Sequence, residues 1–122
     1  MCQSTVAILL VDDDPTFRRL ARRLLASFGL EVVAEAGSVA EALAAAERIR
    51  PSAALVDVQL PDGNGFDLAA QLTAMPWRPR VVMASAQSSG GFDQQARRVG
   101  AEAFVLKADL PRASLSMWLS DE

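Results

Sequence analysis

Hydrophobic residues in this chain form two alternating patterns: short continuous apolar runs, and longer stretches with apolar residues three and four positions apart. Apolar runs stopped by polar or turn-forming residues are typical of buried strands, and the wider spacing is typical of helices with one buried face. The runs predict strands at 6–11, 31–35, 53–57, 80–85 and 103–106. The wider spacing predicts helices from Pro15 to Gly29, from Ser38 to Pro51, over 66–72, around 92–99 and from near Pro111 to Leu119.

Local signals support the first helix boundaries. Asp14 is placed to cap the first free amides of a helix that has Pro15 at its first position. Gly29 is suited to end that helix. Ser38 followed three residues later by Glu41 has the spacing of a capping box, which predicts the start of the second helix.

Strands that alternate with helices indicate a parallel sheet with right-handed crossovers and helices on both faces. We therefore expect an α/β fold with a doubly wound, five-stranded parallel sheet and five helices, formed by residues 1–122 as a single domain. The common small version of this layout has strand order 2-1-3-4-5, which reverses between the first and third strands. The polar run 31–35 fits the edge position that this order gives the second strand. Ligands of such sheets bind beyond the carboxyl ends of the strands at the reversal.

Polar side chains stand at the carboxyl ends of the predicted strands. Asp12 and Asp13 follow the first strand, Asp57 ends the third, Ser85 ends the fourth and Lys107 follows the fifth. Three crowded carboxylates either bind a cation or hold a proton with a raised pKa, and oxygen ligands without histidine or thiolate suit Mg²⁺. Asp57 can form an aspartyl phosphate, while Lys107 and Ser85 add a positive charge and a hydroxyl. This set of groups favours phosphoryl chemistry.

The composition narrows the choice of chemistry. The chain has no histidine, which excludes the usual zinc ligand, Ser-His-Asp and Cys-His catalysis, and a role as a histidine phosphodonor. A net charge of -3 with 51% apolar residues is ordinary for a soluble globular protein and gives no sign of a basic groove for nucleic acid. The lone Cys2 fits a reducing compartment, and no apolar segment approaches the ~20 residues of a membrane span. We therefore expect a cytoplasmic protein.

These positions together resemble the receiver domain of two-component system response regulators, over roughly residues 6–119. Any one of the motifs is weak evidence, whereas five in order at matching strand ends are specific. The matching residues are the acidic pair Asp12-Asp13, the phospho-acceptor Asp57 with Leu60-Pro61 and Gly65 after it, the pair Ser85-Ala86, the switch aromatic Phe104 and the lysine Lys107.

The resemblance implies a flavodoxin-like fold in which Asp57 takes a phosphoryl group from a phosphohistidine. The donor would be a sensor histidine kinase or a phosphotransfer protein. Asp13, Asp57 and the backbone carbonyl of Gln59 would hold Mg²⁺ directly, with Asp12 acting mainly through a bound water. Lys107 would pair with the phosphoryl oxygens. The chain would then catalyse only its own phosphorylation and dephosphorylation, and we do not expect a conventional enzyme.

A switch is also implied by the resemblance. Ser85 would move to hydrogen-bond the phosphoryl group, and Phe104 would turn into the vacated space. An output domain or protein would read the changed face of the fourth helix, fifth strand and fifth helix. The output would include transcription through a DNA-binding domain absent from this chain, and a dimer is a further option. The receiver itself would bind neither nucleic acid nor membrane. Gln59 and Gln87 flank the site and are expected to tune dephosphorylation.

Two departures from the usual receiver pattern are visible. Ala108 follows Lys107 where many receivers have a proline with a cis bond, so a different loop into the fifth helix is expected. The switch residue Phe104 is not tyrosine, and its ring can be buried without a partner for a hydroxyl group.

Other interpretations compete with the receiver. Residues 12–16 fit the Asp-x-Asp-x-Thr loop of haloacid dehalogenase-like phosphatases, with Asp12 as nucleophile and Asp14 as acid/base. That interpretation leaves Asp57 without a role and lacks a late acidic pair for magnesium. A non-phosphorylated interaction module is a third option. Simple structural roles are expected for the arginines at 18, 19, 22 and 23 as a solvated helix face, for the turn Asp62-Gly63, and for Trp77, Trp118 and the phenylalanines other than Phe104 as packing residues.

Overall fold

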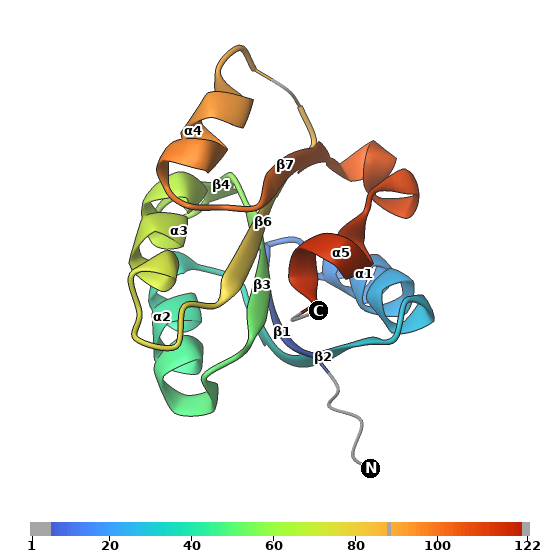
Figure 1. Cartoon of the computed structure of the whole chain (residues 1–122), viewed down its shortest axis with the longest axis horizontal. Coiled ribbons are helices and arrows are strands. Elements are labelled where there is room, and N and C mark those ends of the chain that lie inside the picture. The colour runs from blue at the N-terminus through green and yellow to red at the C-terminus, as the bar shows by residue number, and fades with distance from the viewer. Residues whose placement is uncertain (1–5, 88, 121–122) are drawn as a thin grey trace.

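The computed structural model describes residues 6–87 and 89–120, so Cys2 lies outside the described residues. A five-stranded parallel sheet forms the centre of the molecule, with strand order β2-β1-β3-β6-β7 (Figure 1). This order confirms the expected 2-1-3-4-5, because β6 and β7 are the fourth and fifth long strands. The strands are β1 (Val6–Val11), β2 (Leu30–Ala36), β3 (Ala53–Asp57), β6 (Arg80–Ser85) and β7 (Ala103–Leu106).

Helices cover both faces of the sheet, with α1 and α5 on one side and α2, α3 and α4 on the other (Figure 1). Successive strand residues point to opposite faces: Leu9 and Val11 enter one hydrophobic cluster, whereas Ile8 and Leu10 enter the other. Every residue of β3 is buried, as expected for a central strand. The helices are α1 (Pro15–Ser27), α2 (Val39–Ile49), α3 (Gly65–Thr73), α4 (Phe92–Arg98) and α5 (Leu115–Leu119). Among the described residues, no helix is both long and apolar enough to cross a membrane.

The last helix differs from its prediction. A 3-10 helix, η1 (Lys107–Arg112), contains Pro111, and α5 follows only after Ala113 in extended conformation. The sequence predicts a helix start near Pro111, because proline suits a first helical position. In the structure this proline lies inside the 3-10 helix η1. The loop after Lys107 therefore has a compact form, and no cis peptide bond occurs in the described part of the chain.

A short antiparallel hairpin, β4 (Gln59–Leu60) and β5 (Gly63–Asn64), was not predicted and occupies the loop between β3 and α3. Asp62 at its tip has more than a turn role, because its carboxylate accepts hydrogen bonds from the Val39 and Ala40 amides at 2.7 and 3.1 Å. These two bonds cap α2 from 23 and 22 residues away and lower the pKa of Asp62. The hairpin is thereby tied to the start of α2.

The predicted caps of α1 and α2 are present. The Asp14 carboxylate accepts a hydrogen bond from the Thr16 amide at 2.9 Å, and the Ser38 hydroxyl accepts one from the Glu41 amide at 3.1 Å. The Glu41 carboxylate bonds the amide of Gly37, one residue before the cap, so the return half of the capping box is displaced by one position.

Gly65 allows α3 to begin directly against the end of β3. Its amide donates to the Val58 carbonyl at 2.6 Å, and a Cβ added at Gly65 would lie 1.9 Å from the Asp57 carbonyl oxygen. Such an approach is closed to every other residue type, because the neighbouring atoms belong to backbone that the sheet holds in place. Gly65 therefore fixes the position of the strand end that carries Asp57.

We predict that Gly65→Ala lowers the free energy of unfolding by about 2 kcal/mol or more, because the added methyl group must displace backbone. Chemical denaturation of both proteins measures the change. Gly90→Ala is the matched control, because a Cβ there meets no atom within 4 Å, and its effect should stay within about 0.5 kcal/mol. Equal stabilities for the Gly65 and Gly90 variants would contradict the close approach of α3 to Asp57.

Candidate functional site

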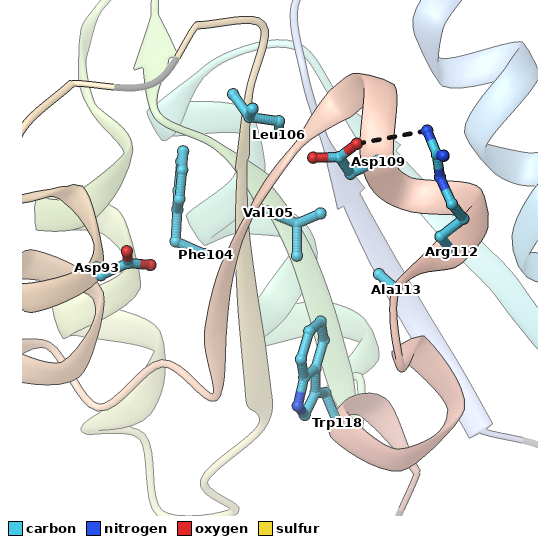
Figure 2. Close-up of a pocket in the computed structure, with 8 residues that line it drawn as sticks. All are labelled: Asp93, Phe104, Val105, Leu106, Asp109, Arg112, Ala113 and Trp118. Atoms are coloured by element: carbon cyan, nitrogen blue, oxygen red, sulfur yellow. Dashed lines mark ion pairs between the residues drawn. The ribbon is translucent and has the colours of Figure 1, made fainter.

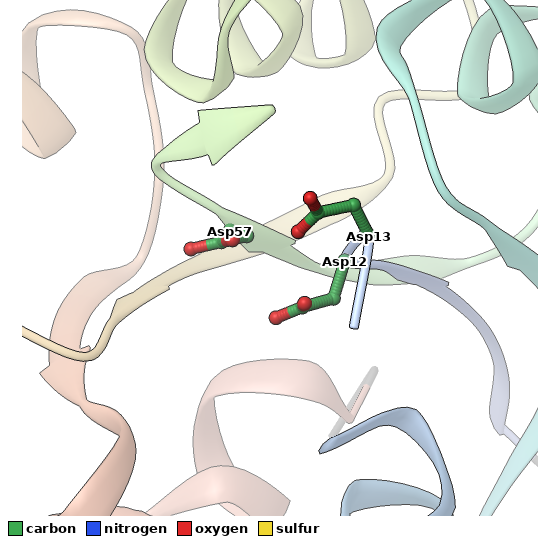
Figure 3. Close-up of side chains that lie close together, drawn as sticks. All are labelled: Asp12, Asp13 and Asp57. Atoms are coloured by element: carbon green, nitrogen blue, oxygen red, sulfur yellow. The ribbon is translucent and has the colours of Figure 1, made fainter. Parts of the chain in front are cut away.

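Three carboxylates meet at the carboxyl ends of β1 and β3, which are neighbouring strands. Each of Asp12, Asp13 and Asp57 offers a carboxylate oxygen, and these oxygens lie within 4.8 Å of one another (Figure 3). Asp12 is 1% exposed and Asp57 is 9% exposed, whereas Asp13 is open to solvent. The structure thus brings together the acids that the strand pattern predicted to meet.

The loop after β1 is fixed by its own hydrogen bonds. The Asp12 amide continues the β1–β2 ladder to the Ala36 carbonyl at 2.9 Å, and the Asp12 carboxylate accepts from the Asp14 amide at 2.9 Å. Arg18 donates to the Asp12 carbonyl and also pairs with Glu35 at 2.9 Å. The expectation that Arg18 belongs to a solvated face is therefore wrong for this residue. Arg18 thus links the loop that carries the acids to Glu35 of β2.

Lys107 supplies the positive charge nearest to the acids. Its ammonium lies 2.5 Å from Asp12 Oδ2 and 3.7 Å from Asp57 Oδ2, and its side chain is 18% exposed. Asp12 Oδ2 is buried and has this ion pair but accepts no hydrogen bond from the described residues. The ammonium thus pairs with two of the three carboxylates, and it lies closer to Asp12 than to Asp57.

Burial and the nearby negative charge of Asp12 raise the pKa of Asp57 from 3.8 to about 6. Asp13 adds a smaller effect in the same direction, while Lys107 and the Gln59 amide lower the pKa without cancelling the rise. Binding of either a proton or a cation stabilises a carboxyl group with such a raised pKa.

The donor set at this edge fits a hard divalent cation. It consists of carboxylate oxygens, and no thiolate or imidazole belongs to the group that the described residues form. Mg²⁺ is bound in proteins through one or two carboxylates and keeps several waters for phosphate oxygens. The buried Asp12 carboxylate belongs to this donor set and lies where such an ion or its waters would meet it.

A pocket beside Asp57 brings together the remaining predicted site residues other than Phe104. Ser85, at the end of β6, is 8% exposed, and its hydroxyl oxygen accepts from the Gln87 amide at 3.3 Å. Lys107 closes another side of the pocket. Phe92, which the sequence did not single out, also borders it. The full lining is Asp57, Gln59, Ser85, Ala86, Gln87, Ser89, Phe92 and Lys107.

Phe104 does not line this pocket in the structure. Its ring lies 5.3 Å from that of Phe92 in an edge contact, and Phe92 makes a similar contact with Phe66 at 5.4 Å. Phe92 therefore stands between the Asp57 pocket and Phe104. No local sequence signal reveals this role, because it depends on three rings from separate elements.

Phe104 instead lines a second hollow, between α4 and the segment formed by η1 and α5 (Figure 2). Trp118, expected as a packing residue, lines it too and also packs against the core. Asp109 and Arg112 form an ion pair of 3.7 Å at one side. The lining is Asp93, Phe104, Val105, Leu106, Asp109, Arg112, Ala113 and Trp118.

Comparison with known proteins supports the family that these site residues resemble. A family profile described as "Response regulator receiver domain" matches residues 8–115. The DNA-binding transcriptional activator DevR/DosR of Mycobacterium tuberculosis is 41% identical over 84% of this chain and 48% of its own length. The chemotaxis protein CheY of Listeria monocytogenes is 30% identical over 82% of this chain and 84% of its own length. The chain therefore spans about half of the DevR/DosR sequence and most of CheY.

Solved structures give the same result. A CheY-like receiver domain protein from Methanospirillum hungatei has a TM-score of 0.81 at 29% identity and covers 93% of this chain and 90% of its own. A LuxR-family two-component response regulator from Aurantimonas has a TM-score of 0.82 at 28% identity, with 94% and 86% covered. These matches favour a signalling domain over the hydrolase interpretation. The chain belongs to the receiver domain family of two-component response regulators.

Proposed function

We propose that this chain, as a single receiver domain over residues 1–122, accepts a phosphoryl group on Asp57. The donor is a phosphohistidine of a sensor histidine kinase or of a phosphotransfer protein, and the exchange takes place in the cytoplasm. The observation that carries the proposal is the position of Asp57. Its largely buried carboxylate ends the central strand, beside two further acids and 3.7 Å from an ammonium.

The acids have separate tasks in this proposal. Asp13, Asp57 and the Gln59 carbonyl would hold Mg²⁺ directly, and Asp12 would act mainly through a bound water. Magnesium, when bound, neutralises the carboxylates and the charge of the phosphoryl oxygens. Asp57, whose pKa burial raises to about 6, would react in its ionised form with a bound cation beside it.

The transfer itself forms one bond and breaks another. An Asp57 carboxylate oxygen bonds to phosphorus, the phosphorus–nitrogen bond of the donor breaks, and its electron pair returns to the partner's imidazole ring. Lys107 pairs with the phosphoryl oxygens, which requires its ammonium to shift from Asp12 toward Asp57. The reaction is stoichiometric, so the chain catalyses only its own phosphorylation and dephosphorylation.

The output follows from the groups beside the pocket. Ser85 turns its hydroxyl to the phosphoryl group, and Phe104 moves toward the space that Ser85 leaves. Because Phe92 contacts Phe104 and borders the pocket, α4 shifts with them. The hollow of Figure 2, on the face of α4, β7 and α5, then changes shape for an output domain, a partner protein or a second copy.

The relatives support two kinds of output. DevR/DosR is named as a DNA-binding activator and CheY as a chemotaxis protein. We propose that this receiver controls transcription through a DNA-binding domain outside residues 1–122. The receiver itself binds neither nucleic acid nor membrane.

We predict that incubation with Mg²⁺ and acetyl phosphate adds one phosphoryl group to the protein, measured as intact mass. The addition should require magnesium and should be lost in Asp57→Asn, which keeps the shape of the side chain but cannot form the acyl phosphate. Asp67→Asn is the matched control, because Asp67 is an exposed acid of α3 outside the acidic cluster. Full phosphorylation of Asp57→Asn would contradict the assignment of the acceptor.

We also predict that Gln59→Ala and Gln87→Ala change the lifetime of the phosphorylated protein, by severalfold each. Both side chains are exposed at the rim of the pocket, where an amide can orient or block an attacking water. The decay of the added mass after removal of acetyl phosphate measures the lifetime. Gln71→Ala, an exposed change on α3, should leave it unaltered. Unchanged decay in both pocket variants would remove this role.

A further inference from the structure

The ammonium of Lys107 has a third neighbour besides Asp12 and Asp57. It lies 4.2 Å from the centroid of the Phe17 ring, within the range of a cation–π contact. Phe17 belongs to the first turn of α1 and is half-buried, whereas Lys107 follows β7. Two elements far apart in the chain thus meet at the Lys107 ammonium.

We propose that Phe17 is a positioning residue for the phosphoryl transfer. The face of its ring keeps the Lys107 ammonium beside the acceptor, 3.7 Å from Asp57 Oδ2, so that only a short shift brings it to the phosphoryl oxygens. This inference rests on the proposed function, and it gives a role to a residue that the sequence suggested was for packing alone.

The physical need for such a residue follows from the lysine side chain. A four-carbon stem lets the ammonium take many positions, and a fixed geometry lowers that freedom before the phosphoryl group arrives. The two carboxylates near Lys107 are poor anchors for this purpose, because both belong to the acidic cluster that we propose holds Mg²⁺. Their hold on Lys107 therefore weakens when a metal competes for them.

The Phe17 ring does not have this conflict. It attracts the ammonium through its electron-rich face but neither accepts a proton nor binds Mg²⁺. The ring also does not occupy the phosphoryl oxygens, so these oxygens can still accept hydrogen bonds from the ammonium. Phe17 therefore keeps Lys107 near Asp57, and the ammonium has further N–H groups to donate to the phosphoryl oxygens.

Phe17 also packs against the hydrophobic cluster of α1 and α5, so simple truncation mixes two effects. Replacement by mono-, di- and trifluorinated phenylalanine separates them. Fluorine draws electron density from the ring face with little change in shape, so it weakens a cation–π contact and preserves the packing.

The experiment measures the initial rate of Asp57 phosphorylation by acetyl phosphate at saturating Mg²⁺. We expect a stepwise fall of the rate with each added fluorine, and a rate about fivefold lower in Phe17→Leu, as loss of a partly exposed cation–π contact implies. Phe28→Leu is the control, because Phe28 also lies at α1 but has no contact with Lys107. Its rate should equal that of the unmodified protein.

Equal rates across the fluorinated series, with Phe17→Leu slow, would show that Phe17 acts through packing alone and would overturn the inference. Equal rates in every Phe17 variant would overturn it as well. In both cases the unmodified protein is phosphorylated on Asp57, so the proposed function stands. Absence of phosphorylation in the unmodified protein would instead overturn the proposed function, and the role of Phe17 with it.

Discussion

Repulsion among the carboxylates at the ends of β1 and β3 is the constraint on which the rest of the structure depends. Strand pairing fixes where Asp12 and Asp57 lie, and burial removes the water that would screen their charges. Burial of Asp57, followed by the negative charge of Asp12, raises its pKa to about 6, and Lys107 offsets only part of this rise. The fold thereby maintains a site whose carboxylate repulsion a bound cation would lower. The same cation would favour the binding of a phosphoryl group.

The surrounding fold keeps these charges from moving apart. Leu55 and Val56 anchor β3 in hydrophobic clusters on opposite faces of the sheet, and α3 begins against the Asp57 carbonyl at Gly65. The Asp62 hairpin joins that loop to α2. On its other side the pocket is bounded by a ring, Phe92, rather than by a fixed backbone segment. The acids are therefore held by the buried sheet, whereas the pocket is bordered toward α4 by a side chain.

The sequence was sufficient to predict the sheet and the acid cluster because both follow from simple rules. Buried parallel strands appear as short apolar runs, and their carboxyl ends meet at one edge, which brings Asp12 and Asp57 together. The α2 cap from Asp62, the link made by Arg18 and the contact of Phe17 with Lys107 were not predicted. Each depends on side-chain directions across distant elements, which periodicity does not encode. The shortened α5 was missed because Pro111 fits a 3-10 turn as well as a helix start.

The most direct test is an NMR titration of the Asp57 side-chain carboxyl in magnesium-free protein. The account predicts an apparent pKa of about 6, which falls when Mg²⁺ is added and also falls in Asp13→Asn. Because the folded-state pKa lies above the ordinary 3.8, the contribution of Asp57 to stability is present at low pH and lost as pH rises through this interval, by about 3 kcal/mol. A pKa near 3.8 that Mg²⁺ leaves unchanged would contradict a repulsive acidic site at this edge.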